Sequence, residues 1–128
     1  MKVLLLLLTL AASSATESRM CPEKLLVHQQ VMSALEPGLR AASTRREHIF
    51  DGVVVTSGPP EYGVQEVVEQ QSVGGKLETI WLVDADTWFS CTYRGTSAQL
   101  QGQIDPKFKE CRLVEDKTAF TETFLCTQ

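Results

Sequence analysis

Alternation of apolar and polar residues along the second half of the chain predicts β-strands. It is clearest over residues 87–93, a run rich in the aromatic and β-branched residues that pack well on a pleated surface. Arg94-Gly95 follows as a two-residue turn, because glycine takes the positive φ that a tight hairpin turn requires. This turn predicts a register of three residue pairs: Tyr93 with Thr96, Cys91 with Ala98, and Phe89 with Leu100.

The hairpin is expected to belong to a three-stranded meander of residues 78–83, 87–93 and 97–104. Asp84-Ala85-Asp86 forms its first connection, since short polar side chains bond to nearby backbone amides and initiate turns. One face of the hairpin is predicted to be core and consists of Phe89, Cys91, Tyr93, Ala98 and Leu100. The opposite face, apart from Trp88, is predicted to be solvated.

Further strands are expected on both sides of the meander. Residues 48–56 predict a strand with a bulge at Asp51-Gly52. Residues 111–115 and 119–126 predict the last two strands, joined by a turn at Asp116-Lys117. The alternation in the last strand places Phe120, Phe124 and Cys126 on one face.

Two segments, residues 24–35 and 62–71, have patterns compatible with either a helix or a strand. In the first we favour a strand, because Val27 and His28 are poor helix formers. In the second, the valine content favours a strand and the three-to-four-residue spacing of the valines favours a helix. Residues 39–47 are polar and are interpreted as a surface connection.

These elements predict an all-β fold, or a β-dominated α+β fold, in which an antiparallel meander forms a curled sheet or small barrel. The length of 128 residues has room for one domain. The expected core, besides the cystines, consists of Val53, Val55, Ile80, Leu82, Phe89, Tyr93, Leu100, Leu113, Phe120 and Phe124.

Residues 1–15 have the pattern of a secretory signal peptide: Lys2, a leucine-rich apolar run, and small residues ending at Ala15. We expect cleavage after Ala15, with cleavage after Ser14 as the near alternative, which leaves a single domain of residues 16–128. No second hydrophobic segment follows, so no membrane span is expected in the mature chain. A periplasmic or secreted location is predicted.

Export makes disulfide bonds available, and Cys21, Cys91, Cys111 and Cys126 form an even set in the mature chain. Four cysteines allow three pairings. We favour Cys91–Cys111 with Cys21–Cys126, which would tie the two ends of the domain together. The main competitor is Cys111–Cys126 with Cys21–Cys91.

The formal charge of −4 argues against a nucleic-acid partner, whose binding requires a basic patch. It is compatible with a basic protein partner. His28 and His48 lack the spacing of a metal site, and spaced cysteines in an oxidising compartment are expected to be bridged rather than metallated. Asp84-Ala85-Asp86 fits a turn better than a paired-carboxylate metal motif, so no metal or cofactor is predicted.

The sequence also disfavours catalysis. Ser57, His48 and Asp51 supply the residue types of a nucleophilic triad, but Ser57 lacks a G-x-S-x-G elbow. His48 and Asp51 would point to opposite faces of a regular strand. An envelope hydrolase that uses these residues is therefore kept only as an alternative hypothesis.

Tyrosine and tryptophan side chains are the best candidates for binding, because they supply a large contact area per residue. Trp81 is expected in the core, whereas Trp88 lies on an otherwise polar face. The proposed binding residues are Ser57, Gly58, Tyr62 and Trp88.

Several spaced motifs resemble a known family. They are Cys21-Pro22 at the mature start, Gly58-Pro59-Pro60-Glu61, Trp81-Leu82, Cys91-Thr92-Tyr93-Arg94-Gly95-Thr96, Cys111 and the last cysteine. This layout resembles a family of small exported proteins of unknown function from Gram-negative bacteria, over most of the mature chain. The resemblance implies a periplasmic or secreted, disulfide-bonded β domain, and it carries over no activity because none is established for the family. The chain departs from the pattern in residues 35–47, where Leu39 stands in place of an aromatic residue.

The loop of residues 57–62 is also similar to a loop of the periplasmic lysozyme inhibitors, in which a serine, a glycine and a tyrosine enter an enzyme cleft; here Tyr62 stands one place too far along. Because an exported compact domain lacks a plausible catalytic set, we predict a periplasmic binding or interaction module without enzymatic activity, with an enzyme inhibitor as one form of it, whose partner is a protein or another envelope component. The alternatives are the envelope hydrolase and a structural component of the envelope.

Overall fold

The computed structural model describes residues 16–65 and 68–128, and these residues form strands and loops without any helix. The strands are β1 Glu17–Arg19, β2 Lys24–Gln29, β3 Thr44–Ser57, β4 Val64–Gln65, β5 Glu69–Val73, β6 Lys76–Leu82, β7 Thr87–Tyr93, β8 Gln99–Gln103, β9 Glu110–Asp116 and β10 Thr121–Thr127. The prediction of an all-β, antiparallel, disulfide-bonded fold is confirmed. The predicted signal peptide lies outside the described residues.

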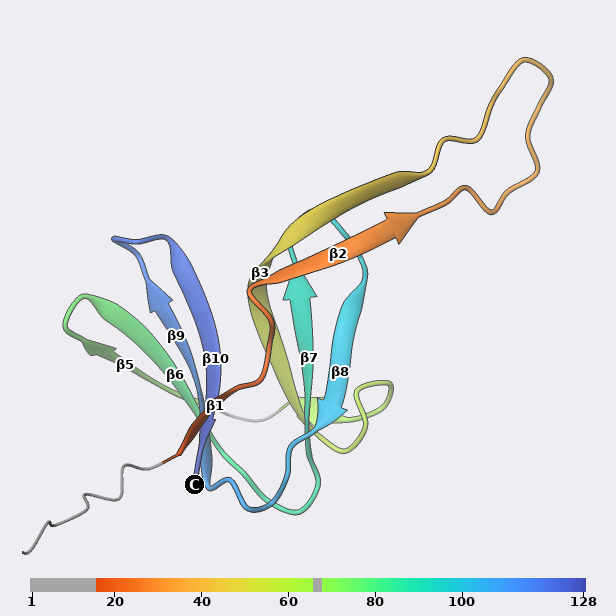
Figure 1. The fold of residues 1–128 in the computed structure, drawn as a ribbon. Coiled ribbons are helices and arrows are strands. Elements are labelled where there is room, and N and C mark those ends of the chain that lie inside the picture. Colours follow the sequence, from red (N-terminus) through yellow and green to blue (C-terminus); the bar gives the residue numbers. More distant parts are fainter. Residues whose placement is uncertain (1–15, 66–67) are drawn as a thin grey trace, which may run out of the picture.

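The strands form two sheets (Figure 1). The first has the order β1-β10-β9-β6-β5; the second has the order β2-β3-β7-β8, and β4 pairs with the end of β3. In Figure 1 the β5, β6, β9 and β10 ribbons stand beside the β3, β7 and β8 ribbons, and the two groups diverge towards the top. The long strand β3 continues beyond this body into an arm with β2.

Aromatic side chains join the two sheets. Phe124 of β10 is fully buried, and the centre of its ring lies 5.9 Å from that of Trp81 on β6 and 5.8 Å from that of Phe89 on β7. The expectation that Trp81 fills the core is confirmed. Of the expected core residues, Leu82 and Phe120 are exposed, so their assignment was wrong. Three buried large apolar residues were not predicted: Phe50, Ile104 and Phe108.

The predicted meander of residues 78–83, 87–93 and 97–104 is wrong in its first step. Strand β6 pairs with β5 and β9, whereas β7 pairs with β3 and β8. The connection between them crosses from one sheet to the other, and the Val83 amide donates to the Lys109 carbonyl in that crossing. Because Trp81 and Phe89 both need burial, the two strands contribute to opposite walls of one core.

The predicted register of the β7–β8 hairpin is also wrong. Cys91 lies opposite Leu100, and Phe89 lies opposite Gly102. Gly95 does have the expected positive φ, of 80°, but the connection extends over residues 94–98. The Arg94 amide donates to the Ile49 carbonyl, and the Thr96 hydroxyl accepts from the Ala98 amide. These bonds lengthen the loop beyond two residues and shift the register.

The disulfides are Cys21–Cys91 and Cys111–Cys126, so the favoured pairing was wrong and its competitor is correct. Cys111 and Cys126 lie directly opposite each other in the β9–β10 ladder, with Cα atoms 4.0 Å apart. That proximity follows from the hairpin register, which the sequence did not supply.

The ambiguous segments 24–35 and 62–71 contain strands and no helix in the described residues, and residues 30–35 and 62–63 belong to loops. Residues 24–29 form β2, as favoured, and residues 64–65 and 69–73 form β4 and β5; residues 66 and 67 lie outside the described part. The bulge at Asp51-Gly52 is confirmed by the register shift between Phe50 and Gly52. Residues 44–47, taken as a surface connection, are instead the start of β3, because they pair with β2.

Candidate functional site

The four predicted binding residues lie in segments that meet at one end of the second sheet, where the chain enters it from the first sheet. Trp88 pairs with Thr56 across the β3–β7 ladder, one position from Ser57. The Gly58 amide donates to the Asp86 carbonyl at 2.8 Å, and the Trp88 indole Nε1 donates to Asp86 Oδ1 at 3.1 Å. Asp86 therefore connects the loop of residues 57–63 to the base of β7.

Internal bonds hold this loop in shape. The Gly63 and Tyr62 amides both donate to the Pro59 carbonyl, and the Thr56 hydroxyl donates to the Gly58 carbonyl at 2.8 Å. Gly63 is required because a Cβ there would lie 2.5 Å from the Gly58 oxygen. The loop leaves Tyr62 79% exposed, so its ring is available for contact with another molecule.

The predicted turn at Asp84-Ala85-Asp86 is confirmed by its hydrogen bonds. Asp84 Oδ1 accepts from the Asp86 amide at 2.8 Å and from the Thr87 hydroxyl at 2.9 Å. Such bonds shape a turn rather than a metal site. Within the described residues, no group of three or more His, Cys, Asp or Glu side chains lies close enough to hold a metal ion.

The residues of the alternative hydrolase hypothesis are engaged separately. His48 Nδ1 lies 2.7 Å from the Arg94 carbonyl oxygen, and Asp51 Oδ1 accepts from the Thr92 hydroxyl at 2.8 Å. Ser57 lies at the exposed end of β3. No hydrogen bond joins any two of the three in the part of the chain that the structure describes.

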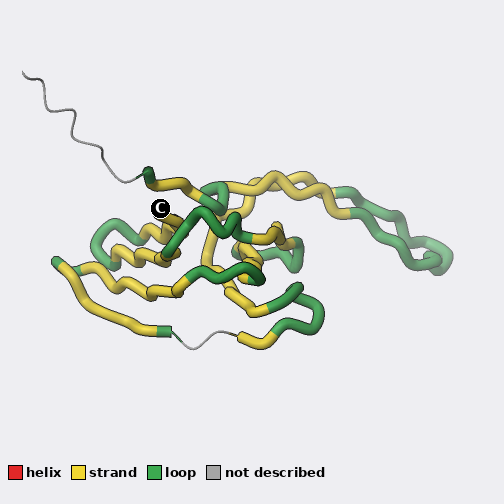
Figure 2. Tube along the Cα trace, turned by 90° about the horizontal axis from the view of Figure 1, so that it is seen from below, coloured by secondary structure: helices red, strands yellow, loops and turns green. Residues whose placement is uncertain are grey.

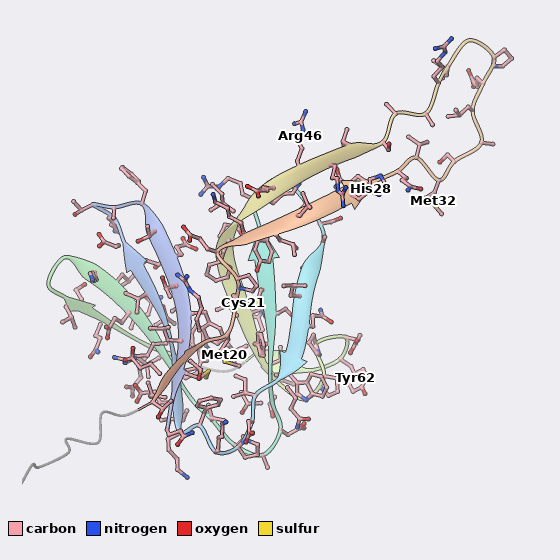
Figure 3. All side chains as sticks on the ribbon, viewed as in Figure 1. Met20, Cys21, His28, Met32, Arg46 and Tyr62 are labelled. Atoms are coloured by element: carbon pink, nitrogen blue, oxygen red, sulfur yellow. A yellow bond between two sulfur atoms is a disulfide. The ribbon has the colours of Figure 1, made fainter. Side chains whose placement is uncertain are left out.

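Sequence reasoning missed the most exposed feature of the molecule. Strand β2 and residues 44–49 of β3 form a two-stranded ribbon that projects from the body and ends in the loop of residues 30–43 (Figures 1 and 2). We call residues 24–49 the arm. Figure 3 shows Met32 and Arg46 along the arm and Tyr62 at the other end of the second sheet. The two surfaces are therefore separate.

The base of the arm is firmly attached to the body. Cys21, just before β2, is bonded to Cys91 on β7, and the Tyr93 hydroxyl donates to the Pro22 carbonyl at 2.8 Å. Burial raises the pKa of Tyr93, so this hydroxyl keeps its proton as a donor. The contact of His48 with the Arg94 carbonyl fixes the other strand.

Beyond this base, apolar side chains of the arm meet solvent. Met32 is 91% exposed and Leu39 is 63% exposed. The other exposed large apolar residues of the arm are Leu26, Val31, Leu35 and Ile49. In the sequence, Leu26, Val31, Met32 and Leu35 fall in the ambiguous segment 24–35, and Leu39 falls in the segment interpreted as a polar connection.

A cleft of about 680 Å³ lies between the base of the arm and the β9–β10 hairpin. Ile49 and Phe50 line one side, and Phe120 and Glu122 line the other. Phe120 is 93% exposed and has a φ of 53°, the left-handed region that a bulky side chain rarely occupies. The hairpin tip thus holds an aromatic ring in solvent at a cost in backbone strain.

The carboxyl group of Glu122 in this cleft has an altered acidity. Burial raises its pKa to about 6, and the neighbouring carboxylates of Glu115 and Asp51 act in the same direction, against the opposing effect of Arg94. Glu115 lies directly opposite Glu122 in the β9–β10 ladder. The cleft therefore changes its charge in mildly acidic solution.

No helix in the described residues is long and apolar enough to cross a membrane.

Comparison with known proteins places this architecture in a family. A search of curated proteins and a search of solved structures gave no match. The family model of the type VI secretion system Tli immunity protein matches residues 43–127, which include every strand from β3 to β10. This match confirms the expected resemblance to a small bacterial protein family. The chain belongs to the family of type VI secretion system Tli immunity proteins.

Proposed function

We propose that this protein is a periplasmic immunity protein that binds a type VI secretion effector and blocks its activity by occupying its surface. The observation that carries the proposal is the family match over residues 43–127. An immunity protein works by binding, so it needs surface for contact rather than catalytic groups. The large exposed apolar side chains of the arm, Tyr62 and Phe120 supply such surface.

An oxidising compartment is part of the proposal. The two disulfides together use all four cysteines, and all four are buried in the core. Disulfides of this kind persist outside the reducing cytosol. With the leader pattern of residues 1–15, they support a protein that meets its effector in the periplasm.

The loop of residues 57–63 and Trp88 form one proposed contact surface. Tyr62 projects from a loop whose backbone is already fixed by hydrogen bonds, so little conformational entropy is lost when it binds. The contact residues are those predicted from the sequence: Ser57, Gly58, Tyr62 and Trp88.

The proposal is tested by protection from intoxication. Type VI effectors are directed one at a time to the periplasm of a host that also produces this protein, and growth is measured. We expect the full chain to restore growth against at least one effector and to form a stable complex with it in size-exclusion chromatography. A version without residues 1–15 is the matched control and should give no protection. Growth arrest by every effector despite the full chain would contradict the proposal.

The loop surface is tested with Tyr62→Ala and Trp88→Ala combined. Paired aromatic anchors commonly account for about 30-fold or more of an affinity, so the effector's Kd should rise by that factor while thermal unfolding is unchanged. Val73→Ala, an exposed change at the β5–β6 turn, serves as the control. An unchanged Kd in the double variant would remove this surface from the proposal.

A further inference from the structure

We propose that the arm, residues 24–49, is the element that selects the effector, and that it enters an apolar cleft on that effector whose two walls carry carboxylates. This inference rests on the proposed function, because it concerns the partner of an immunity protein. The occupant to which it commits is the effector. Self-association and binding to an anionic membrane are its competitors.

The arm does not owe its shape to packing. Isolated two-stranded ribbons are at most marginally stable in water. In the described residues, β2 has β3 as its strand partner, and residues 44–49 pair with β2 alone. Among the described residues, one side-chain hydrogen bond joins residues 26–47 to the body: Gln29 Nε2 donates to the Thr96 hydroxyl at 3.3 Å. A segment kept in this form is better explained by a bound partner than by the fold.

The composition of the arm fits an apolar environment. Val31, Met32, Leu35 and Leu39 lie in or beside its terminal loop and are exposed. A loop that only connects two strands would be served by polar residues, since exposed apolar patches favour association. Met32 adds an unbranched, adaptable side chain of the type common at binding surfaces.

The arm differs in charge from the rest of the molecule. It carries four cationic side chains against two carboxylates, for a formal charge of +2; these are Lys24, Arg40, Arg45 and Arg46 with Glu36 and Glu47. Residues 16–23 and 50–128 carry seven cationic side chains against fourteen carboxylates, for a formal charge of −7. A partner whose site is acidic would be attracted by the arm and repelled by the body, which would orient the encounter.

The register places an arginine and an apolar residue on each face of the ribbon, although the face of Leu25, Val27 and His48 is half-buried at the base of the arm. Arg45 lies opposite His28, and Arg46 lies opposite Val27, so the two arginines are adjacent in sequence and point to opposite faces. Apolar residues also divide between the faces, with Val27 on one and Leu26 on the other. A membrane surface would require apolar and basic side chains on one face. Arginines on both faces suit insertion between two walls.

The extent of the family match supports a role in selection. It begins at residue 43, so β2 and residues 30–42 of the terminal loop lie outside the matched range, whereas residues 44–49 of the arm and the body from β3 to β10 lie within it. Discrimination between effectors needs a contact surface that differs among related immunity proteins. The arm is such a surface, built on a base that the Cys21–Cys91 bond holds in place.

The experiment uses the effector that the wild-type protein neutralises. If no such effector exists, the proposed function is rejected together with this inference, which rests on it; if one exists, the variants test this inference by itself. Three variants of the full chain are compared: Arg40→Glu with Arg45→Glu and Arg46→Glu; Met32→Ser with Leu35→Ser and Leu39→Ser; and a body control, Lys76→Glu with Lys107→Glu and Lys109→Glu. The control makes the same change in net charge at three exposed body positions. Thermal unfolding confirms that each variant is folded.

We expect the charge-reversal variant to raise Kd by about 10-fold or more and to lose most of the salt dependence of association. The serine variant should raise Kd by about 30-fold or more, and the control should stay within about 2-fold. Arm variants that bind like wild type would overturn the inference. So would a wild-type dimer that the arm variants abolish, or arm-dependent sedimentation with phosphatidylglycerol vesicles in place of effector binding.

Discussion

The β9–β10 hairpin and the arm are both antiparallel ribbons with an unbroken register, yet they have opposite relations to the core. The first contains seven facing pairs and the second contains six. In β9–β10, Phe124, Cys111 and Cys126 are completely buried. In the arm, every residue from His28 to Glu47 is exposed. Backbone pairing alone therefore does not decide whether a ribbon stabilises the protein; the side chains on its faces do.

This difference suggests a division of labour. The β9–β10 hairpin supplies one wall of the core and is crosslinked across its strands, so substitutions in it should reduce the free energy of unfolding. The arm contributes little buried area, so substitutions in it should affect binding and leave stability unchanged. Three measurements would break or sharpen the contrast.

The largest effect is expected from truncating a buried ring. Phe124→Ala removes the side chain that contacts both Trp81 and Phe89, and should lower the free energy of unfolding by about 3–5 kcal/mol. Leu39→Ala in the arm should change it by less than about 0.5 kcal/mol. Urea denaturation measures both. Similar losses for the two variants would show that the arm is packed in solution.

The two disulfides should differ next. Replacing both cysteines of a bridge by alanine should cost about 4 kcal/mol for Cys21–Cys91, with a sequence separation of 70, and about 3 kcal/mol for Cys111–Cys126, with a separation of 15. Hydrogen exchange should then locate the change. Loss of Cys21–Cys91 should speed exchange at the base of β2, and loss of Cys111–Cys126 should leave the arm unaffected. The reverse pattern would show that the Cys21–Cys91 bond does not hold the base of the arm in place.

The smallest effect concerns Glu122 on the wall of the cleft. Its pKa of about 6 exceeds the ordinary value of 4.5, so the folded state holds the proton more tightly than the unfolded state does. The contribution of Glu122 to stability should therefore be greatest below about pH 4.5 and decline as the pH rises through about 6. Glu122→Gln should remove this decline and gain at most about 1 kcal/mol at pH 7, because solvent screens a partly exposed carboxyl.

The matched change in the arm is Glu36→Gln, which removes an exposed carboxylate far from the core. Thermal unfolding between pH 4 and pH 7 compares the two variants with the wild type. A decline that persists in Glu122→Gln would assign it to another group.

Local pattern predicted most strands but not their neighbours. Residues 87–93 had the right element and buried face, because alternation along a strand depends only on its own sequence. The opposite face was wrongly expected to be solvated: Ser90 is buried and Thr92 is half-buried, since β3 and β8 flank the strand on both sides. The predicted pairing of β6 with β7 was wrong because an Asp-rich turn can connect two strands of a hairpin or two strands in different sheets. Phe120 failed for a related reason: extending the alternation of β10 by one step placed in the core a residue that belongs to the turn.

The candidate binding residues show the same limit. Tyr62 and Trp88 were chosen for their side-chain chemistry, and the structure places their segments in contact through Asp86. The arm was overlooked because its apolar residues resemble the buried residues of any strand. Only the absence of a covering layer, a property of the whole fold, distinguishes them.

The sequence by itself determined the all-β class, the positions of most strands, the need for two bridges among four cysteines and the acidic balance of the chain, since each follows from residue type and short-range periodicity. The tertiary structure decided which cysteines meet, which strands cross between sheets and which apolar residues remain in water. Those outcomes depend on contacts between residues distant in sequence, where burial is shared among segments and no single segment encodes it.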